Sequence, residues 1–70
     1  METHDIHGIK VDFHNGTGHM VSTLRNMPKE EALKFLNGAK GSEQYGFGNN
    51  RIKHEEKNGE DHFSVHPHHH

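Results

Sequence analysis

The chain has 70 residues, a formal net charge of −2 at pH 7 and an apolar content of 27%. This length predicts one domain, and the low apolar content predicts a small core. Because the sequence holds no cysteine, a disulfide cannot stabilise that core, and we expect support from self-association instead. The slightly negative charge is unusual for a general nucleic-acid binder, since most are basic.

No apolar run approaches the length of a membrane span or of the apolar part of a secretory signal peptide. We therefore expect a soluble, cytoplasmic protein with no membrane partner. The absence of cysteine is compatible with that compartment.

The first strand signal is the alternation of apolar and polar residues over residues 9–13. Residues 15–18 form a turn cluster rich in glycine, and alternation resumes over residues 20–25. These segments predict an antiparallel hairpin. Residues 1–5 are short and polar, and we expect them to be frayed.

A four-residue loop would place Val11 opposite Ser22 and His14 opposite His19 in this hairpin. Neutral imidazole suits zinc, nickel or copper, so His14 and His19 are candidate metal ligands. The alternative interpretation is a set of exposed polar residues in a sequence with ten histidines, because no established metal motif is present. We expect no cofactor beyond a divalent metal ion bound adventitiously by histidine.

Residues 28–37 carry the clearest helical period in the chain. Pro28 suits the first helical position, and Gly38 suits a left-handed residue at the end. The apolar residues fall at the spacing of one helical face, and the stripe is Ala32, Phe35, Leu36 and Ala39. A helix of this length is marginal alone and needs a sheet or another chain to cover the stripe.

The second hairpin is predicted by Asn58-Gly59 between two strand-like runs, residues 51–56 and 61–66. A two-residue loop sets the register, with opposite charges meeting across the strands. The expected pairs are Lys57 with Glu60, Glu55 with His62, His54 with Phe63, and Ile52 with Val65.

The elements together predict an α+β fold of ββαββ order, with two antiparallel hairpins flanking one amphipathic helix. We expect one domain over residues 1–66, completed by self-association as a homo-dimer or higher oligomer. Residues 67–70 are expected to form a His-rich disordered tail, either native or derived from a purification tag.

Residues 45–50 form an aromatic stretch interrupted by glycine. It fits a bulged strand, or an ordered loop whose Tyr45 and Phe47 seal the core. It is also similar to the middle of the RNP1 strand of RNA-recognition domains, with Arg51 and Lys53 near enough to neutralise phosphates. The match ends after Gly48, where asparagines stand in place of the aromatic and apolar residues of that strand.

Residues 13–53 resemble the small KTSC domain in layout. The resemblance is carried by Phe13-His14-Asn15-Gly16 at a strand end, by Met27-Pro28 at a helix start, and by Arg51-Ile52-Lys53 after an aromatic residue. The second hairpin departs from that family, and the resemblance carries no specific functional motif.

We do not expect an enzyme. The possible nucleophiles Ser22, Ser42 and Ser64 have no nucleophile-elbow context, and the core is too small to enclose an acid–base pair. The sequence instead predicts a small binding protein, a regulator or inhibitor of a protein partner, with a size typical of phage or mobile-element proteins.

The expected contact residues are Tyr45, Phe47, Arg51 and Lys53, because aromatic and arginine side chains dominate binding hot spots. Two alternatives remain open from the sequence. One is an RNA- or DNA-binding module that uses the same four residues, and the other is a His-based metal-binding or pH-responsive protein.

Overall fold

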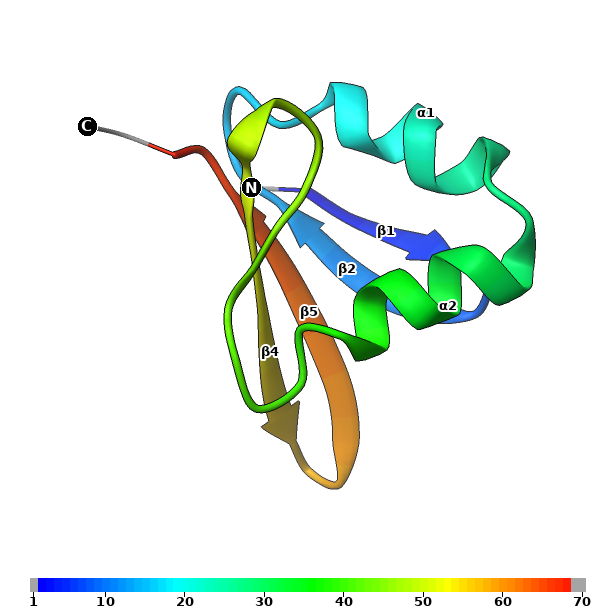
Figure 1. The fold of residues 1–70 in the computed structure, drawn as a ribbon. Coiled ribbons are helices and arrows are strands. Elements are labelled where there is room, and N and C mark those ends of the chain that lie inside the picture. The colour runs from blue at the N-terminus through cyan, green and yellow to red at the C-terminus, as the bar shows by residue number, and fades with distance from the viewer. Residues whose placement is uncertain (1, 69–70) are drawn as a thin grey trace.

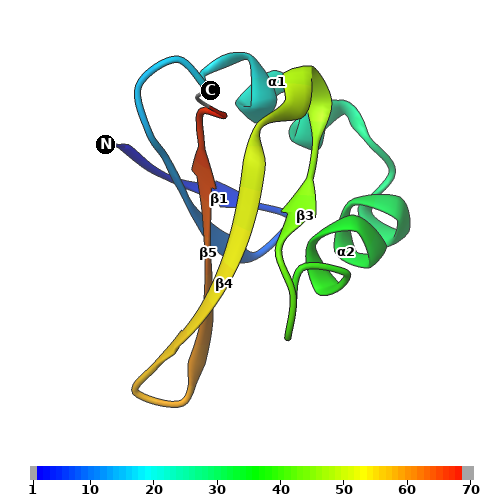
Figure 2. The ribbon, with the colours of Figure 1, turned by 60° about the vertical axis from the view of Figure 1, so that its left-hand side comes forward.

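The computed structural model describes residues 2–68 and consists of one five-stranded sheet and two helices. The elements follow the order β1 (Glu2–Ile6), β2 (Ile9–Phe13), α1 (His19–Asn26), α2 (Lys29–Asn37), β3 (Gln44–Tyr45), the 3-10 helix η1 (Phe47–Asn49), β4 (Arg51–Lys57) and β5 (Glu60–His66). The strand order in the sheet is β1-β2-β5-β4-β3, of which Figure 1 shows β1, β2, β5 and β4, and Figure 2 shows β3 beside β4. The α+β class is as predicted, but the arrangement differs from ββαββ.

The predicted first hairpin is wrong, because residues 20–25 belong to helix α1. Met20 and Leu24 are fully buried and lie one helical turn apart, with Val21 beside them on the helix surface. This spacing satisfies both a strand and a helix over so short a segment. The segment is helical in the structure, where Met20 and Leu24 both pack into the core between α1 and the sheet.

The true partner of β2 in a hairpin is β1, in the segment that we expected to be frayed. His7 and Gly8 form the connecting turn, both with positive φ (52° and 90°), as a two-residue hairpin loop requires. The ring Nε2–H of His7 also donates to the carbonyl oxygens of Leu24 and Met27, each at 3.1 Å. The turn is therefore fixed to the C-terminal end of α1.

Helix α2 confirms the predicted helix, with small differences at both ends. Pro28 precedes the first helical residue, and its carbonyl accepts a hydrogen bond from the Ala32 amide at 3.0 Å. Gly38 has a right-handed conformation, and the left-handed residue is Gly41 in the following loop. The predicted stripe faces the core, since Ala32, Leu36 and Ala39 are buried.

The second hairpin has the predicted register at all four expected pairs. The charges expected to meet across the strands at Lys57/Glu60 and Glu55/His62 form ion pairs along each strand instead. Lys57 Nζ lies 3.5 Å from Glu55 Oε2, and His62 Nε2 lies 3.9 Å from Glu60 Oε2. Both pairs are solvent-exposed at the carboxylate and contribute little to stability.

Both helices lie on one side of the sheet (Figure 2). The core between the layers consists of Ile6, Val11, Phe13, Met20, Leu24, Ala32, Leu36, Ala39, Ile52, Phe63 and Val65. The radius of gyration is 11.0 Å, and a compact chain of this length is expected to have about 11 Å. The sheet of the same chain covers the apolar stripe of α2, which is one of the two possibilities that the sequence left open.

The chain ends carry no further element in the part that the structure describes. Residues 67 and 68 lie outside helices and strands, and the rest of the predicted tail, residues 69–70, falls outside the described residues. None of the helices within residues 2–68 has the length and apolar character needed to cross a membrane.

A polar contact ties the loop after α2 to the second hairpin. Asp61 accepts hydrogen bonds from Lys40 Nζ and from His54 Nε2, both at 2.7 Å. The bond from Lys40, and then the bond from His54, lower the pKa of the Asp61 carboxyl below its ordinary value of 3.8.

This contact predicts an acid-sensitive contribution to stability. Because the folded pKa of Asp61 is depressed, its contribution is present above pH 3.8 and is lost as pH falls through the folded pKa. Urea unfolding of Asp61→Asn across this range should therefore give a flatter dependence of unfolding free energy on pH than the unmodified chain. Identical acid slopes for the two proteins would contradict the assignment.

Gly46 provides a test of core packing. A Cβ at this position would lie 3.0–3.2 Å from side-chain atoms of Met20, Phe35 and Ile52. Gly46→Ala should therefore destabilise the fold by about 1–3 kcal/mol through overpacking. Gly18→Ala is the matched control, since Gly18 has φ −58° and open space around a Cβ.

We expect the control to leave stability unchanged or to raise it by about 0.4–1 kcal/mol through the unfolded chain. Thermal unfolding of both variants provides the measurement. Equal stability of the two variants would show that the backbone at Gly46 does not approach the core as described.

Candidate functional site

The face of the sheet opposite the helices carries polar side chains along its whole width. Three of the predicted contact residues meet there, because neighbouring strands place paired residues on the same face. Tyr45 pairs with Arg51, Arg51 pairs with His66, and Lys53 pairs with Ser64. We call Tyr45, Arg51 and Lys53 the β3–β4 surface.

Phe47, the fourth predicted contact residue, lies on the other side of the sheet edge. Its ring stacks on Phe35 of α2, with centroids 5.8 Å apart and planes at 27°. Gly46 faces the core between the two aromatics, where it approaches Met20 and Ile52. The structure therefore separates Tyr45 from Phe47, and neither is a core plug, since they are 52% and 41% exposed.

The loop that carries these aromatics is fixed by Asn50, a buried residue that the sequence did not identify as important. Its Nδ2 group donates to the carbonyl oxygen of Phe47 at 2.9 Å, which determines the orientation of the amide. The other Nδ2 hydrogen then points to Nε2 of His19 at 3.1 Å, so that nitrogen accepts. Asn50 thus ties η1 to the first residue of α1.

Arg51 is the charged centre of the β3–β4 surface. Its Nη1 lies 3.4 Å from Glu43 Oε1, a long ion pair between two side chains that are each 35% exposed. Its Nε is buried and has no hydrogen-bond partner within residues 2–68. The Glu43 carboxylate therefore partly neutralises the guanidinium, whose exposed part lies beside Tyr45, while the Nε–H is enclosed.

Histidines occupy the next part of the same face. The rings of His14 and His66 stack with centroids 4.0 Å apart, and Ser64 Oγ lies 2.9 Å from His66 Nε2. Burial, followed by the nearby charges of His14, Lys53 and Arg51, lowers the pKa of His66 below its ordinary value of 6.5. His66 therefore favours its neutral form in the folded protein.

The two histidines predicted as metal ligands are not opposed across a hairpin. His14 follows β2 and stacks on His66, whereas His19 begins α1 and contacts Asn50. The predicted hairpin was the reason to expect His14 and His19 to share a metal ion, and the structure does not contain that hairpin. Within residues 2–68, no group of three or more histidine and carboxylate side chains is arranged to hold a metal ion.

An open hollow of about 190 Å³ lies on this face, beside the stacked imidazoles and the Ser64 hydroxyl. Ser64 and His66 resemble two members of a nucleophilic set. Such a set also needs a group that orients the imidazole, and the described contacts of His66 are with Ser64 and the His14 ring. The carboxylates of Asp12 and Glu55 also line the hollow.

Comparison with known proteins gives no match for this chain, whether with protein-family models, curated protein sequences or solved structures. The resemblance to the KTSC domain consequently has no support from a family model.

Asn50 predicts a test of how the loop is fixed. Asn50→Ala removes the side-chain hydrogen bonds to Phe47 and His19 and should lower stability by about 0.5–1.5 kcal/mol for each bond lost. Hydrogen exchange of the amides in residues 46–50 should accelerate more than exchange in β4 and β5. The exposed Ser42→Ala variant serves as the control.

The expected pattern is selective loosening of the loop in Asn50→Ala and no change in Ser42→Ala. Uniform acceleration across the whole sheet would mean that Asn50 supports global stability only.

Proposed function

We propose that the protein is a small non-enzymatic binding protein that regulates or inhibits a protein partner through the β3–β4 surface. The observation that carries the proposal is the position of Tyr45. It is a half-exposed aromatic side chain on the sheet face opposite the helices, directly paired with Arg51 and met edge-on by the His68 ring, with centroids 5.4 Å apart. Tyrosine and arginine are the residue types most enriched at the energetic centres of protein interfaces.

The contacts that hold residues 45–50 in place favour a role of Tyr45 in binding a partner. Asn50 holds η1 against α1, and Tyr45 is in β3, paired to β4. A contact residue that is already held in place loses less conformational entropy on binding than one in a mobile loop. This arrangement supports Tyr45 as an anchor.

The charge around the surface favours a protein partner over nucleic acid. Arg51 and Lys53 are accompanied by Glu43 and Glu55 on the same two strands or beside them. Mixed charges suit the polar rim of a protein interface, whereas a phosphate backbone attracts a surface of one sign.

Two other functions remain candidates. Nucleic-acid binding would use Tyr45, Arg51 and Lys53 without Phe47, since Phe47 lies on the helix side. A pH-responsive role would use the His14–His66 stack, because protonation of both rings would place like charges 4.0 Å apart.

The wider proposal keeps a cytoplasmic location, a phage or mobile-element origin and self-association as a homo-dimer. The small size and the lack of cysteine are compatible with all three. Self-association would have to use polar faces or strand edges, because the apolar stripes are covered within one chain.

Tyr45→Ala tests the proposal directly. Capture of proteins from a lysate by the immobilised chain should yield a partner that is lost with Tyr45→Ala and with Arg51→Ala. Because Tyr45 packs little against the core, its removal should change the free energy of unfolding by no more than about 0.5 kcal/mol. Lys29→Ala, on the exposed side of α2, provides the matched control.

A partner that survives nuclease treatment and a rise in salt would support protein recognition. Affinity for nucleic acid that falls steeply with salt would favour the other candidate. Undiminished capture by Tyr45→Ala would refute the assignment of this surface.

A further inference from the structure

The edge of the sheet opposite β3 is formed by β1, and it carries a second surface. The two-residue turn makes Ile6 and Ile9 a hydrogen-bonded pair, so Glu2 and His4 also direct their backbone groups to β2. Thr3 and Asp5 then direct their backbone N–H and C=O groups away from the sheet. The backbone hydrogen bonds outside the regular ladders involve none of residues 2–6.

Carboxylates surround this edge. The Glu2 side chain is 81% exposed and the Asp5 side chain is 54% exposed. Asp12 lies on the adjacent strand, where it accepts a hydrogen bond from the Thr3 hydroxyl. Two cations lie near them: Lys10, at 3.7 Å from Asp5, and Arg25, at 3.4 Å from the His4 ring that contacts Glu2, so three carboxylates face two cations. The edge is therefore acidic.

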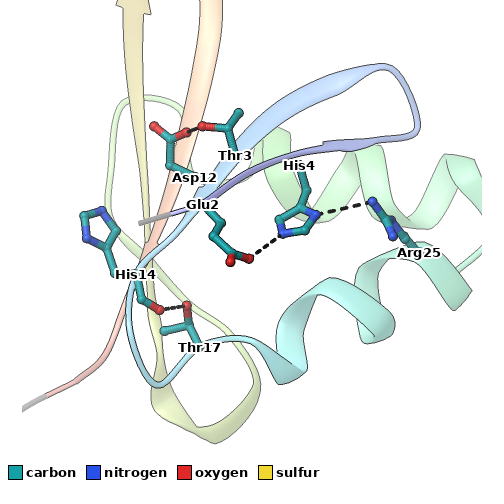
Figure 3. A network of polar contacts seen from close by, with 7 residues as sticks. All are labelled: Glu2, Thr3, His4, Asp12, His14, Thr17 and Arg25. Atoms are coloured by element: carbon teal, nitrogen blue, oxygen red, sulfur yellow. Dashed lines mark hydrogen bonds and ion pairs between the residues drawn. The ribbon is translucent and has the colours of Figure 1, made fainter.

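A polar chain on β1 holds one of these carboxylates in place (Figure 3). Arg25 donates to Nδ1 of His4 at 3.4 Å, so Nε2 of His4 carries the proton and donates to Glu2 at 3.2 Å. The His4 ring also contacts the Phe13 ring edge-on, with centroids 5.5 Å apart. Glu2 is thus held beside the rings of His4 and Phe13.

A groove of about 290 Å³ opens at this position. Phe13 and Val21 supply apolar surface, and Glu2 lies at the rim with His4. A lysine or arginine side chain has the matching form, since its aliphatic stem packs on apolar surface while its charged head reaches a carboxylate. Alternate side chains of an added strand point to the helix side of the sheet, so one of them beside Glu2 and His4 would enter the groove.

We propose that the β1 edge binds an extended, basic segment of a protein partner, which adds to the sheet as a sixth strand. Backbone hydrogen bonds to Thr3 and Asp5 provide affinity, and the carboxylates and groove select basic side chains. The opposite strand β3 has only two residues, so β1 is the longer edge. This surface is separate from the β3–β4 surface and does not depend on the function proposed for it.

The test uses a synthetic seven-residue peptide of alternating lysine and valine. At a peptide concentration ten times its Kd, the amides of Thr3 and Asp5 should exchange with solvent about tenfold more slowly. A peptide with glutamate in place of lysine should leave exchange unchanged. Chemical shifts of Glu2, His4 and Phe13 should move with the lysine peptide alone.

Two variants of one residue separate strand addition from side-chain contacts. Thr3→Pro removes an outward N–H and should weaken peptide binding about tenfold or more, whereas Thr3→Val keeps that N–H and should change binding less than about twofold. Glu2→Gln and Asp5→Asn should each weaken binding about two- to fivefold. Tyr45→Ala should bind the peptide normally, and thermal unfolding verifies that each variant folds.

Three results would overturn the proposal. They are equal affinity for the lysine and glutamate peptides, equal effects of Thr3→Pro and Thr3→Val, and a dimer through β1 that excludes the peptide. The last result would assign the edge to a second copy of the chain.

Discussion

The structure depends on the parallel pairing of β2 with β5 at the centre of the sheet. Val11 lies opposite Phe63, and Phe13 lies opposite Val65, with all four side chains buried. This pairing joins a hairpin from the start of the chain to a hairpin from its end. Without it, the chain would have two separate hairpins, each too small to be stable alone.

The same pairing gives the helices their surface. The two hairpins together form a sheet wide enough to cover the buried residues of α1 and α2. All of the apolar stripes are then used on one side, which leaves the other face and both edges for polar residues. We propose functional surfaces at two of these positions. The β3–β4 surface lies on the face opposite the helices, and the β1 edge lies at the other end of the strand order.

The sequence predicted those elements whose signals are local. Asn58-Gly59 specifies a turn with a defined loop length, and the loop length alone sets the register of every pair in the hairpin. The period of α2 was readable because the helix is flanked by Pro28 and Gly38. In both cases the deciding interaction spans only a few residues.

The prediction was wrong for the segments whose secondary structure depends on contacts distant in the sequence, namely α1 and β1. The spacing of Met20 and Leu24 fits either period, and only the width of the sheet beneath them selects a helix. Strand β1 has one fully buried apolar residue, Ile6, and gains order from pairing with β2 and from the His7 contacts to α1. The turn that joins β1 to β2 carries a weaker local signal than Asn58-Gly59, because histidine takes the place of asparagine before the glycine.

In the candidate site too, features set by local sequence were predictable and features set by distant contacts were not. Tyr45 and Arg51 were chosen by residue type, and their pairing on one face follows from the short strand β3. The separation of Phe47 could not be predicted, because it depends on the 3-10 turn and on its contact with Phe35. The role of Asn50 was hidden for a similar reason, since its partner His19 is distant in the sequence.

Nuclear Overhauser effects from the backbone of β2 would test the central pairing most directly. The structure predicts contacts of Val11 with Phe63 and of Phe13 with Val65, in parallel register. Contacts of Val11 with Ser22, in the antiparallel register of a hairpin between residues 9–13 and 20–25, would contradict it. In that case the sheet, the positions of both helices and the two proposed surfaces would all have to be rebuilt.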